Sequence, residues 1–589
     1  MRQVRAIRIA GYAGFIMILI YLFWYLRQVD LSLFYYWQQS VPLPFGDSLA
    51  VPGGVATFLG DWFLETLTGP LKGSISVILI VGVVFFSLHV IFRRLKDIPL
   101  FYILLLAALI PFIMLFARYR LPAGLILSLA AGFLLAALHS LYDPRNTRIA
   151  TAYNFLFAVL VYLVAGAAGL IILLQAVIIR VVVSKKYLAL LTVIPMLAVP
   201  LLHLLFDGSV TLKLAYLGSF VISRYDELPV TVYFSLLSPF LIFLLYSGMD
   251  AWLSRFSRKW MFPACGAGIL VVLFVLFFAS RSAINDQERE VFRIYQAAFR
   301  KDWQEVIRLT SGRPYLNQLV QYEVNKALYH TGRLLDDLFL YPQQYAEKAL
   351  FMEGNASSRI AIHMISYYYD MGFANEARHW ANEAHVGLMR HPVVLKNLAM
   401  TYLALGYEEA ARKYLRILSG SGLHREWSEQ VLQMIENGTA GEHPEIRFFR
   451  RNDPETDFFA ETGNPTRKLK AFYLNNPDNQ MAFEFLIASY LLQHRLGDVI
   501  SYIPVFREHG YSKLPKAVEE AILIYVTRSR DNRVPMAGYR ISQQEWEDFQ
   551  DFSRLVASTT DRNERISKVS KYGNTYWFYI LFTSPYASK

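Results

Sequence analysis

The change of character near Arg281 is the feature that most constrains this chain. Residues 1–280 are a succession of long apolar stretches, whereas residues 281–589 alternate apolar and polar positions at helical spacing. A long apolar stretch satisfies its backbone inside a bilayer as a helix, and an amphipathic helix needs water on one face. The pattern predicts an all-α protein with a polytopic membrane domain over 1–280 and a soluble helical domain over 281–589.

The charge distribution supports this division. The chain has a mean hydropathy of +0.30 and a net charge of +11. Residues 1–280 hold 20 Lys and Arg against 10 Asp and Glu, which leaves 38 against 37 for the rest. The excess therefore lies in the membrane half, where cationic loops set orientation, and no basic patch remains for nucleic acid.

Other common site types are missing from the sequence. The single cysteine, Cys265, excludes an intramolecular disulfide and a zinc site of several thiolates. No Gly-rich loop ending in Lys-Ser or Lys-Thr marks a nucleotide site. We therefore predict no metal site, no nucleotide motif and no implied cofactor.

The apolar stretches have lengths suited to crossing a bilayer. They lie at about 9–26, 75–92, 99–117, 121–141, 188–206, 229–246 and 261–280, with a longer one at 149–183. The longer stretch fits one tilted helix or two short helices. Two crossings place 13 cationic residues on the cytoplasmic side against 6 outside, in keeping with the positive-inside rule. We therefore predict nine spans, with the N-terminus in the cytoplasm and the tail outside, although Arg118 and Arg120 then lie on the outer side.

The first outer loop, residues 28–74, contains the sequence Pro52-Gly53-Gly54 followed by an amphipathic helical pattern. Apolar residues recur at helical spacing, while Asp61 and Glu65 share another face at i, i+4. Trp62 is suited to anchor such a helix at the membrane surface. We predict a helix that lies in the membrane interface.

The soluble part carries a periodic signal. Gly372 and Gly406 lie 34 residues apart, the tetratricopeptide period, and each follows one apolar helix and precedes an Ala-containing one. The residues expected to pack the repeats are Tyr368, Gly372, Ala377, Ala384, Tyr402, Gly406 and Ala411. The clearest repeats span residues 357–425, and weaker helix pairs flank them. The pattern favours an irregular tetratricopeptide-like repeat domain over a plain helical bundle, and such domains bind protein partners.

Several blocks resemble an uncharacterised family of bacterial multispanning membrane proteins. These blocks are Pro52-Gly53-Gly54 with the following Phe-Leu-Gly-Asp-Trp-Phe, Asn325-Lys-Ala-Leu-Tyr-His-Thr-Gly-Arg-Leu, Pro342-Gln-Gln and Asn476-Pro-Asp-Asn-Gln-Met-Ala-Phe-Glu-Phe-Leu. The resemblance extends over nearly the whole chain. It implies an inner-membrane protein of Gram-negative bacteria with a tetratricopeptide-like periplasmic tail, and it implies no reaction.

Acidic residues of the first loop are the candidate catalytic groups: Asp47, Asp61 and Glu65. Membrane glycosyltransferases that use polyprenyl-linked sugars place an acid in this loop, where it can act as a general base or hold a divalent cation. Candidate ligand-binding residues on the same side are Arg118, Arg120, Arg224 and Asp226. The alternative is that the acids form the wet face of an interfacial helix and the arginines reach lipid headgroups.

Histidines near span ends offer a further possibility. His89, His139 and His203 would suit a proton relay or a metal site if the helices brought them together. Single histidines hydrogen-bonded within a helical bundle are the commoner case.

The sequence favours two functions. The first is an inner-membrane scaffold whose periplasmic tail binds a protein partner in envelope processes, with membrane lipids around its spans. The alternative is a polyprenyl-phosphate-sugar-dependent glycosyltransferase, in which a divalent cation is the one cofactor to consider.

Overall fold

The computed structural model describes residues 2–587 apart from 50, 94, 96–98, 143–145, 186, 207–210, 221–227, 254–260, 313–316, 352–357, 453–463 and 530–532. Every regular element in these described residues is a helix, and they contain no strand. The chain divides into two compact units. Unit 1 comprises Met1–Arg289 with Gly420–Leu423, and unit 2 comprises Glu290–Ser419 with His424–Lys589.

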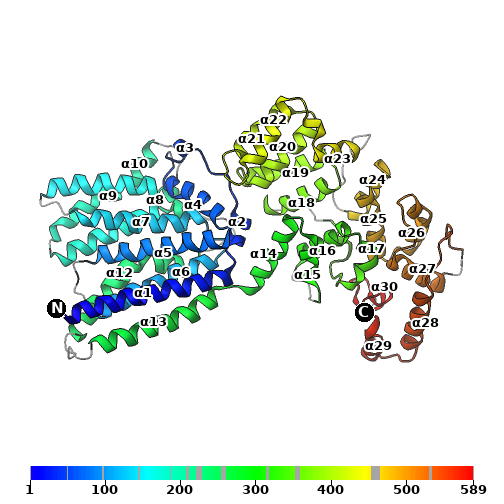
Figure 1. Ribbon diagram of the computed structural model, residues 1–589, viewed down its shortest axis with the longest axis horizontal. Coiled ribbons are helices and arrows are strands. Elements are labelled where there is room, and N and C mark those ends of the chain that lie inside the picture. Colours follow the sequence, from blue (N-terminus) through cyan, green and yellow to red (C-terminus); the bar gives the residue numbers. More distant parts are fainter. Residues whose placement is uncertain are drawn as a thin grey trace. The chain divides into compact units, whose positions relative to one another are not determined.

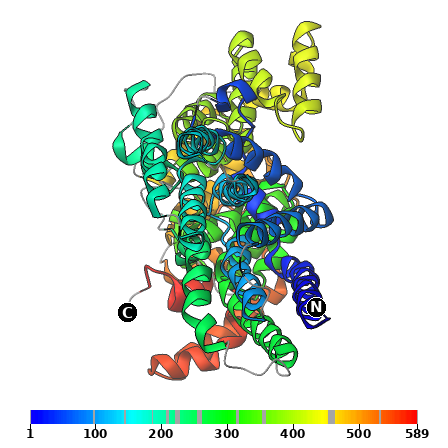
Figure 2. The ribbon, with the colours of Figure 1, turned by 90° about the vertical axis from the view of Figure 1, so that its left-hand side faces the viewer.

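Unit 1 is a bundle of long apolar helices, with the short helices α2, α3 and α4 toward one end (Figure 1). The α-helices are α1 (Arg2–Val29), α2 (Ser32–Gln38), α3 (Phe45–Leu49), α4 (Gly54–Thr66), α5 (Pro70–Ile91), α6 (Pro99–Met114), α7 (Ala123–Leu141), α8 (Thr147–Val183), α9 (Ile194–Leu197), α10 (Val199–Phe206), α11 (Leu212–Leu217), α12 (Val230–Leu253) and α13 (Met261–Ala283). Short helical turns are η1 (Leu115–Ala117), η2 (Tyr187–Val193) and η3 (Gly218–Phe220). Figure 2 looks along the bundle, so several of these helices are seen nearly end-on.

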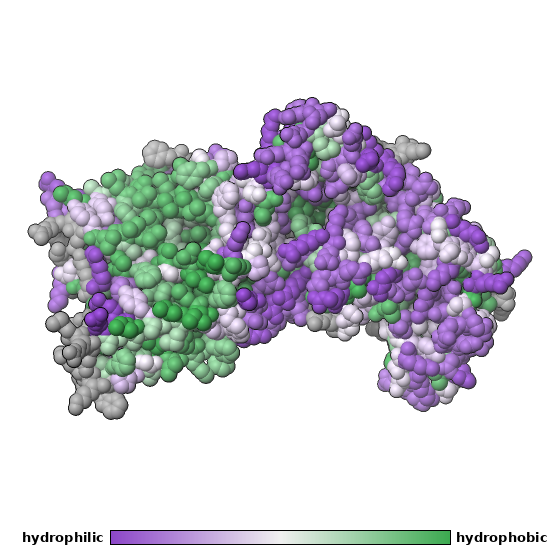
Figure 3. Space-filling model, viewed as in Figure 1, coloured by the Kyte–Doolittle hydropathy of each residue, from purple (hydrophilic) through white to green (hydrophobic). Residues whose placement is uncertain are grey.

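Seven helices among the described residues are long and apolar enough to cross a membrane. They are Arg5–Val29, Pro70–Ile91, Pro99–Ala117, Ala123–Leu141, Thr147–Val183, Val230–Gly248 and Met261–Ala283. The bundle surface is apolar, as the green area of Figure 3 shows. Leu79 and Leu156 on this surface are 65% and 67% exposed. Exposed apolar side chains in such numbers are stable only against lipid, so these helices form a membrane domain. The count of nine spans stays a prediction.

The long apolar stretch at 149–183 forms α8, which reverses direction at Gly166 (φ 62°, ψ −156°). Before the reversal, Asn154 Oδ1 lies 2.9 Å from His139 Nε2, near the end of α7. After it, Arg180 donates to the carbonyl of Tyr142 (3.1 Å), again at that end. Only glycine adopts this backbone conformation readily. The halves 147–165 and 167–183 therefore run in opposite directions along α7.

The buried side chain of Gln175 in α8 bridges a break in the backbone hydrogen bonds of α12. Pro239 lies inside α12 and has no N–H to give to the carbonyl of Ser235. Ser238 Oγ donates to that carbonyl instead (2.9 Å). Gln175 of α8 then bridges the next position: its Nε2 donates to the Leu236 carbonyl (2.9 Å), and its Oε1 accepts from Phe240 N (3.3 Å). The amide thus satisfies backbone groups that lipid cannot.

Unit 2 consists of shorter helices. They are α14 (Asp286–Phe299, which begins in unit 1), α15 (Trp303–Thr310), α16 (Gln318–His330), α17 (Leu334–Asp337), α18 (Ser358–Asp370), α19 (Ala374–Gly387), α20 (Pro392–Ala404), α21 (Glu408–Leu418), α22 (Arg425–Glu436), α23 (Pro444–Asn452), α24 (Pro465–Asn475), α25 (Gln480–Leu492), α26 (Leu496–Ser501), α27 (Lys516–Arg528), α28 (Gln543–Ala557), α29 (Arg562–Lys568) and α30 (Tyr576–Phe578). Consecutive helices α18, α19, α20 and α21 each pack against the next.

The two periodic glycines end the first helix of each of these pairs. Gly372 (φ 81°) follows α18, and Gly406 (φ 84°) follows α20. The next amide in each case donates back to the carbonyl of an aromatic residue, Tyr368 (2.9 Å) or Tyr402 (2.8 Å). This is a Schellman motif, which favours glycine at its left-handed position. The motif explains the two glycines, whereas it uses only the backbone carbonyls of Tyr368 and Tyr402.

The side chains expected to pack the repeats lie mostly inside unit 2. Tyr368 is buried, and Ala377, Ala384 and Ala411 are fully buried. Tyr402 is half-buried and stacks on the ring of Tyr414, with centroids 5.8 Å apart. The small alanines let the paired helices approach closely.

A buried group of charges lies between α16 and α18. Lys326 Nζ is 3.6 Å from Glu323 and 3.3 Å from Asp370, and it donates to Ser366 Oγ (2.6 Å). All three charged side chains are at most 5% exposed. Burial raises the pKa of both carboxyls, but the Lys326 ammonium, acting together with His363 at Glu323 and with His330 and Lys301 at Asp370, holds each pKa below its ordinary value.

Candidate ligand cavity in unit 1

Close backbone contacts fix the position of α4 on α7. A Cβ added to Gly60 would lie 2.7 Å from Gly124 N, at the start of α7. Gly124 in turn approaches the backbone of Thr57, 3.2 Å from an added Cβ. These glycines let α4 lie directly on the backbone of α7.

Gly53 fixes the other end of α4. Its N–H lies 3.0 Å from the carbonyls of both Tyr162 and Leu163, at the end of the first half of α8. Its φ is +72°, and an added Cβ would lie 3.2 Å from Gly166. A side chain here would be strained and would press against the α8 reversal. The Pro52-Gly53-Gly54 sequence therefore joins the first loop to the place where α8 turns back.

These contacts enclose a cavity of about 540 Å³. Its walls come from α2, one face of α4, the start of α7, the α8 reversal and the α10–η3 region. The lining residues are Gln38, Val51, Pro52, Gly53, Thr57, Asp61, Leu64, Pro122, Ala123, Gly124, Leu125, Ser128, Ala167, His203, Leu214, Ala215 and Gly218. The size and the apolar walls with few polar groups are typical of a small-molecule site.

The polar side chains of the cavity differ in how many hydrogen bonds they make within the protein. Gln38 is structural: its Nε2 donates to the carbonyls of Tyr119 (2.6 Å) and Leu121 (2.7 Å), and its Oε1 accepts from Ala123 N (2.9 Å). It therefore caps the first turn of α7. Asp61 and His203 are the titratable groups among the described lining residues. His203 Nδ1 lies 3.5 Å from Tyr162 OH, at the limit of a hydrogen bond.

The three candidate acids occupy different places. Asp61 lines the cavity, one residue after the Gly60 contact that positions it. Asp47 is exposed on the five-residue helix α3 and does not line it. Glu65 is one turn further along α4, where it accepts a hydrogen bond from Ser421 Oγ (2.7 Å). Only Asp61 combines a carboxylate with a cavity.

The candidate arginines are not among the described residues that line this cavity. Arg120 Nε donates to Glu288 (2.7 Å), and its guanidinium lies over the Trp37 ring. Arg118 is half-buried, and its Nε has no hydrogen-bond partner among the described residues. Arg224 and Asp226 lie outside the described residues. Pyrophosphate binding by these residues stays a prediction.

The histidines near span ends form neither a metal site nor a relay among the described residues. In the part of the chain that the structure describes, no three His, Cys, Asp or Glu residues are grouped so as to hold a metal ion. His139 pairs with Asn154 near the end of α7, whereas His203 lines the cavity beside the start of that helix. These two histidines are therefore not brought together.

The sequence gives no signal for the cavity walls formed by α2 and α7, and only one for the wall formed by α8. Gln38 and the start of α7 carry no motif, and their role depends on a contact between residues more than 80 positions apart. Ala167 becomes part of the wall only because α8 reverses at Gly166. The Gly-Ala run at 165–169 was the one available signal for that reversal.

The whole chain belongs to a protein family of unknown function, DUF6057, whose family model matches residues 4–583. The resemblance to an uncharacterised family is thereby confirmed. Comparisons with curated proteins and with solved structures find no match.

Proposed function

We propose that this protein is a membrane glycosyltransferase that takes its sugar from a polyprenyl-phosphate carrier, with Asp61 as the general base. One observation carries the proposal: Asp61, alone of the first-loop acids, lines a cavity of about 540 Å³. The cavity belongs to a membrane domain, which suits a substrate carried on a lipid.

In the proposed reaction, the Asp61 carboxylate acts as a general base. Asp61 accepts the proton of an acceptor hydroxyl as that oxygen forms a bond to the anomeric carbon of the sugar. The bond between that carbon and the phosphate oxygen breaks, and polyprenyl phosphate leaves with its electron pair. His203, on the wall formed by α10, is a second group able to exchange a proton there.

The topology that suits this function has nine crossings: α1, α5, α6, α7, both halves of α8, the segment around Leu190–Leu205, α12 and α13. Two contacts support a crossing by the Leu190–Leu205 segment. Thr192 pairs with Asn154 (2.8 Å) near one end of the first half of α8, and His203 lies beside Tyr162 near the other. The cavity and the tail then lie on the periplasmic side of a bacterial inner membrane.

A fusion experiment tests this topology. A reporter enzyme that is active only outside the cytoplasm is expected to be active when fused after Lys589. The same reporter inserted after Lys185 is expected to be silent. Silence after Lys589 at normal protein level would remove one of the nine crossings.

A scaffold function for the tail is the second candidate. The paired helices with their 34-residue glycine spacing support a tetratricopeptide-like repeat domain, and such domains bind proteins. Val386 and Met389 at the end of α19 are 80% and 66% exposed. These two side chains would be the first to test as part of a binding surface. In this function the loop acids are dispensable and the tail acts in envelope processes through its partner.

The Asp61→Asn substitution separates the two functions. It keeps the side-chain size and removes the base, so a cell carrying it is expected to behave like a deletion strain at unchanged protein level. Asp47→Asn is the matched control, because it alters an exposed acid of the same loop. Full function of the Asp61→Asn strain would reject the enzyme and leave the scaffold.

A further inference from the structure

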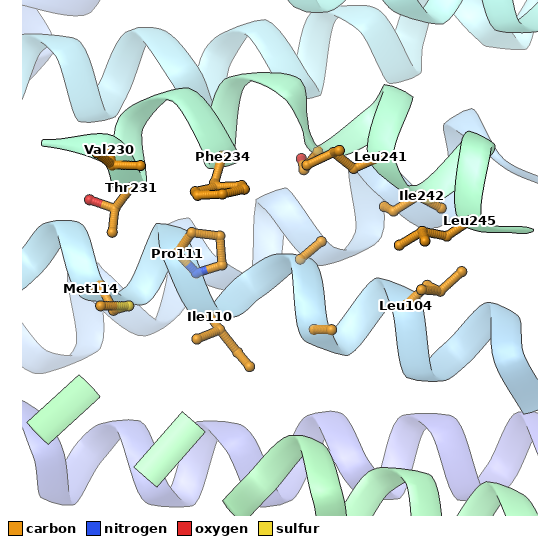
Figure 4. Close-up of a pocket in the computed structure, with 13 residues that line it drawn as sticks. Leu104, Ile110, Pro111, Met114, Val230, Thr231, Phe234, Leu241, Ile242 and Leu245 are labelled. Carbon is orange, nitrogen blue, oxygen red and sulfur yellow. The ribbon is translucent and has the colours of Figure 1, made fainter. Parts of the chain in front are cut away.

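A second cavity of about 450 Å³ lies between α6 and α12. Figure 4 shows its two walls, with Pro111 of α6 facing Phe234 of α12. Of the 13 residues that line it, all except Thr231 and Ser238 are apolar. Such a lining offers almost nothing to a polar ligand and matches hydrocarbon.

The cavity is elongated along the helices. On α6 its lining extends from Leu104 to Met114, and on α12 from Val230 to Leu245. With a rise of about 1.5 Å per residue, these stretches are about 15 Å and about 22 Å long. Both helices are among the seven candidate spans, so the long axis of the cavity follows the direction of a lipid chain in the bilayer.

The two hydroxyls of the lining are not equivalent. Ser238 Oγ already donates to the Ser235 carbonyl, which Pro239 leaves without a backbone N–H partner, so this hydroxyl is engaged within the helix. Thr231 Oγ1 is buried and has no hydrogen-bond partner among the described residues. Thr231 lies in the first turn of α12, the end of the cavity to which Met114 also belongs. The unpaired hydroxyl therefore marks one end of an otherwise apolar cavity.

That end leads toward the Asp61 cavity along the chain. Met114 is followed directly by η1 (Leu115–Ala117), and then by the turn whose carbonyls at Tyr119 and Leu121 bind Gln38. Pro122, which comes next, lines the Asp61 cavity. Both cavities thus lie toward the same end of the bundle.

We propose that the cavity between α6 and α12 binds the prenyl chain of the lipid carrier whose sugar occupies the Asp61 cavity. The inference rests on the proposed function. The chain leaves its phosphate at the Thr231 end, where the unpaired hydroxyl can donate to a phosphate oxygen, and runs along α6 and α12 toward Leu104 and Leu245. The sugar is held where the carboxylate acts.

A binding measurement with polyprenyl phosphate tests the site. Ala108→Phe fills the cavity from the α6 wall and is expected to weaken binding of labelled polyprenyl phosphate to the purified full-length protein at least tenfold. Leu156→Phe is the matched control, because this exposed side chain faces outward from α8. Thr231→Val adds no bulk and is expected to weaken binding several-fold, which covers the case in which Ala108→Phe fails to fold.

The outcomes are distinct from those of the Asp61 experiment. Unchanged binding in both Ala108→Phe and Thr231→Val would overturn the inference. Competition by phosphatidylethanolamine as effective as that by unlabelled polyprenyl phosphate would also overturn it, since the cavity would then hold an ordinary acyl chain. Asp61→Asn is expected to bind the carrier normally. Its loss of function together with normal binding by the cavity variants would leave the proposed function standing without this site.

Discussion

Replacing Lys326 by methionine is expected to destabilise unit 2 by about 3–5 kcal/mol, because it leaves two buried carboxylates without their cation. Glu323 and Asp370 lie within 3.6 Å of the ammonium in the native chain. The measurement is hydrogen exchange on the full-length protein, in which the amides of α16 and α18 should lose protection.

The matched control and the pH dependence make this prediction specific. Lys301, 60% exposed and 3.7 Å from Asp370, should cost less than about 1 kcal/mol when changed to methionine. In the native chain both carboxyls have lowered pKa values, so their contribution is present above their ordinary values of 4.5 and 3.8 and is lost as the pH falls below them. Without Lys326, burial is opposed only by His363, His330 and Lys301, so both pKa values should rise and the variant should gain less stability than the native chain as the pH rises. Equal exchange rates in Lys326→Met and Lys301→Met would contradict the account.

Replacing Gly60 by alanine is expected to displace α4 from α7 and to abolish function. The new methyl group would meet backbone atoms of Gly124 at 2.7 and 2.8 Å, and backbone cannot move aside as a flexible side chain does. Overpacking of this kind costs about 1–3 kcal/mol. The melting temperature of the purified protein should fall. Cells carrying the variant should behave like a deletion strain even where the protein still accumulates.

Gly82→Ala is the control for this substitution. Gly82 also lies in an apolar helix, but a Cβ added there meets nothing within 4 Å. Its melting temperature should be unchanged or slightly raised, since alanine favours helix over glycine. A Gly60→Ala protein that melts and functions like the Gly82→Ala protein would show that the close contact between α4 and α7 does not position Asp61.

The helices of this chain could be predicted from its sequence far better than its site. Apolar runs of span length and the alternation after Arg281 predict helices directly, because each depends on local pattern. The Schellman glycines Gly372 and Gly406 were likewise visible, since their backbone role is local. The cavity was not, because it depends on Gly60 meeting Gly124 and on Gln38 capping α7, contacts between distant parts of the chain.

The loop acids illustrate the same division. Sequence alone placed Asp47, Asp61 and Glu65 in one loop but gave no means of ranking them. The ranking comes from the reversal of α8 at Gly166, which brings Ala167 and the Pro52-Gly53 turn to one cavity with Asp61. A Gly-Ala run permits such a reversal without requiring it, so in the sequence only the charge balance favoured two crossings over one.

The most direct test of the proposed function is the amount of polyprenyl-phosphate-linked sugar in lipid extracts, measured by mass spectrometry. Cells with Asp61→Asn should accumulate the same carrier-linked sugar as a deletion strain, while Asp47→Asn cells should match the wild type. If no carrier-linked sugar accumulates in either the deletion or the Asp61→Asn strain, the cavity does not use such a donor and the proposed function is wrong.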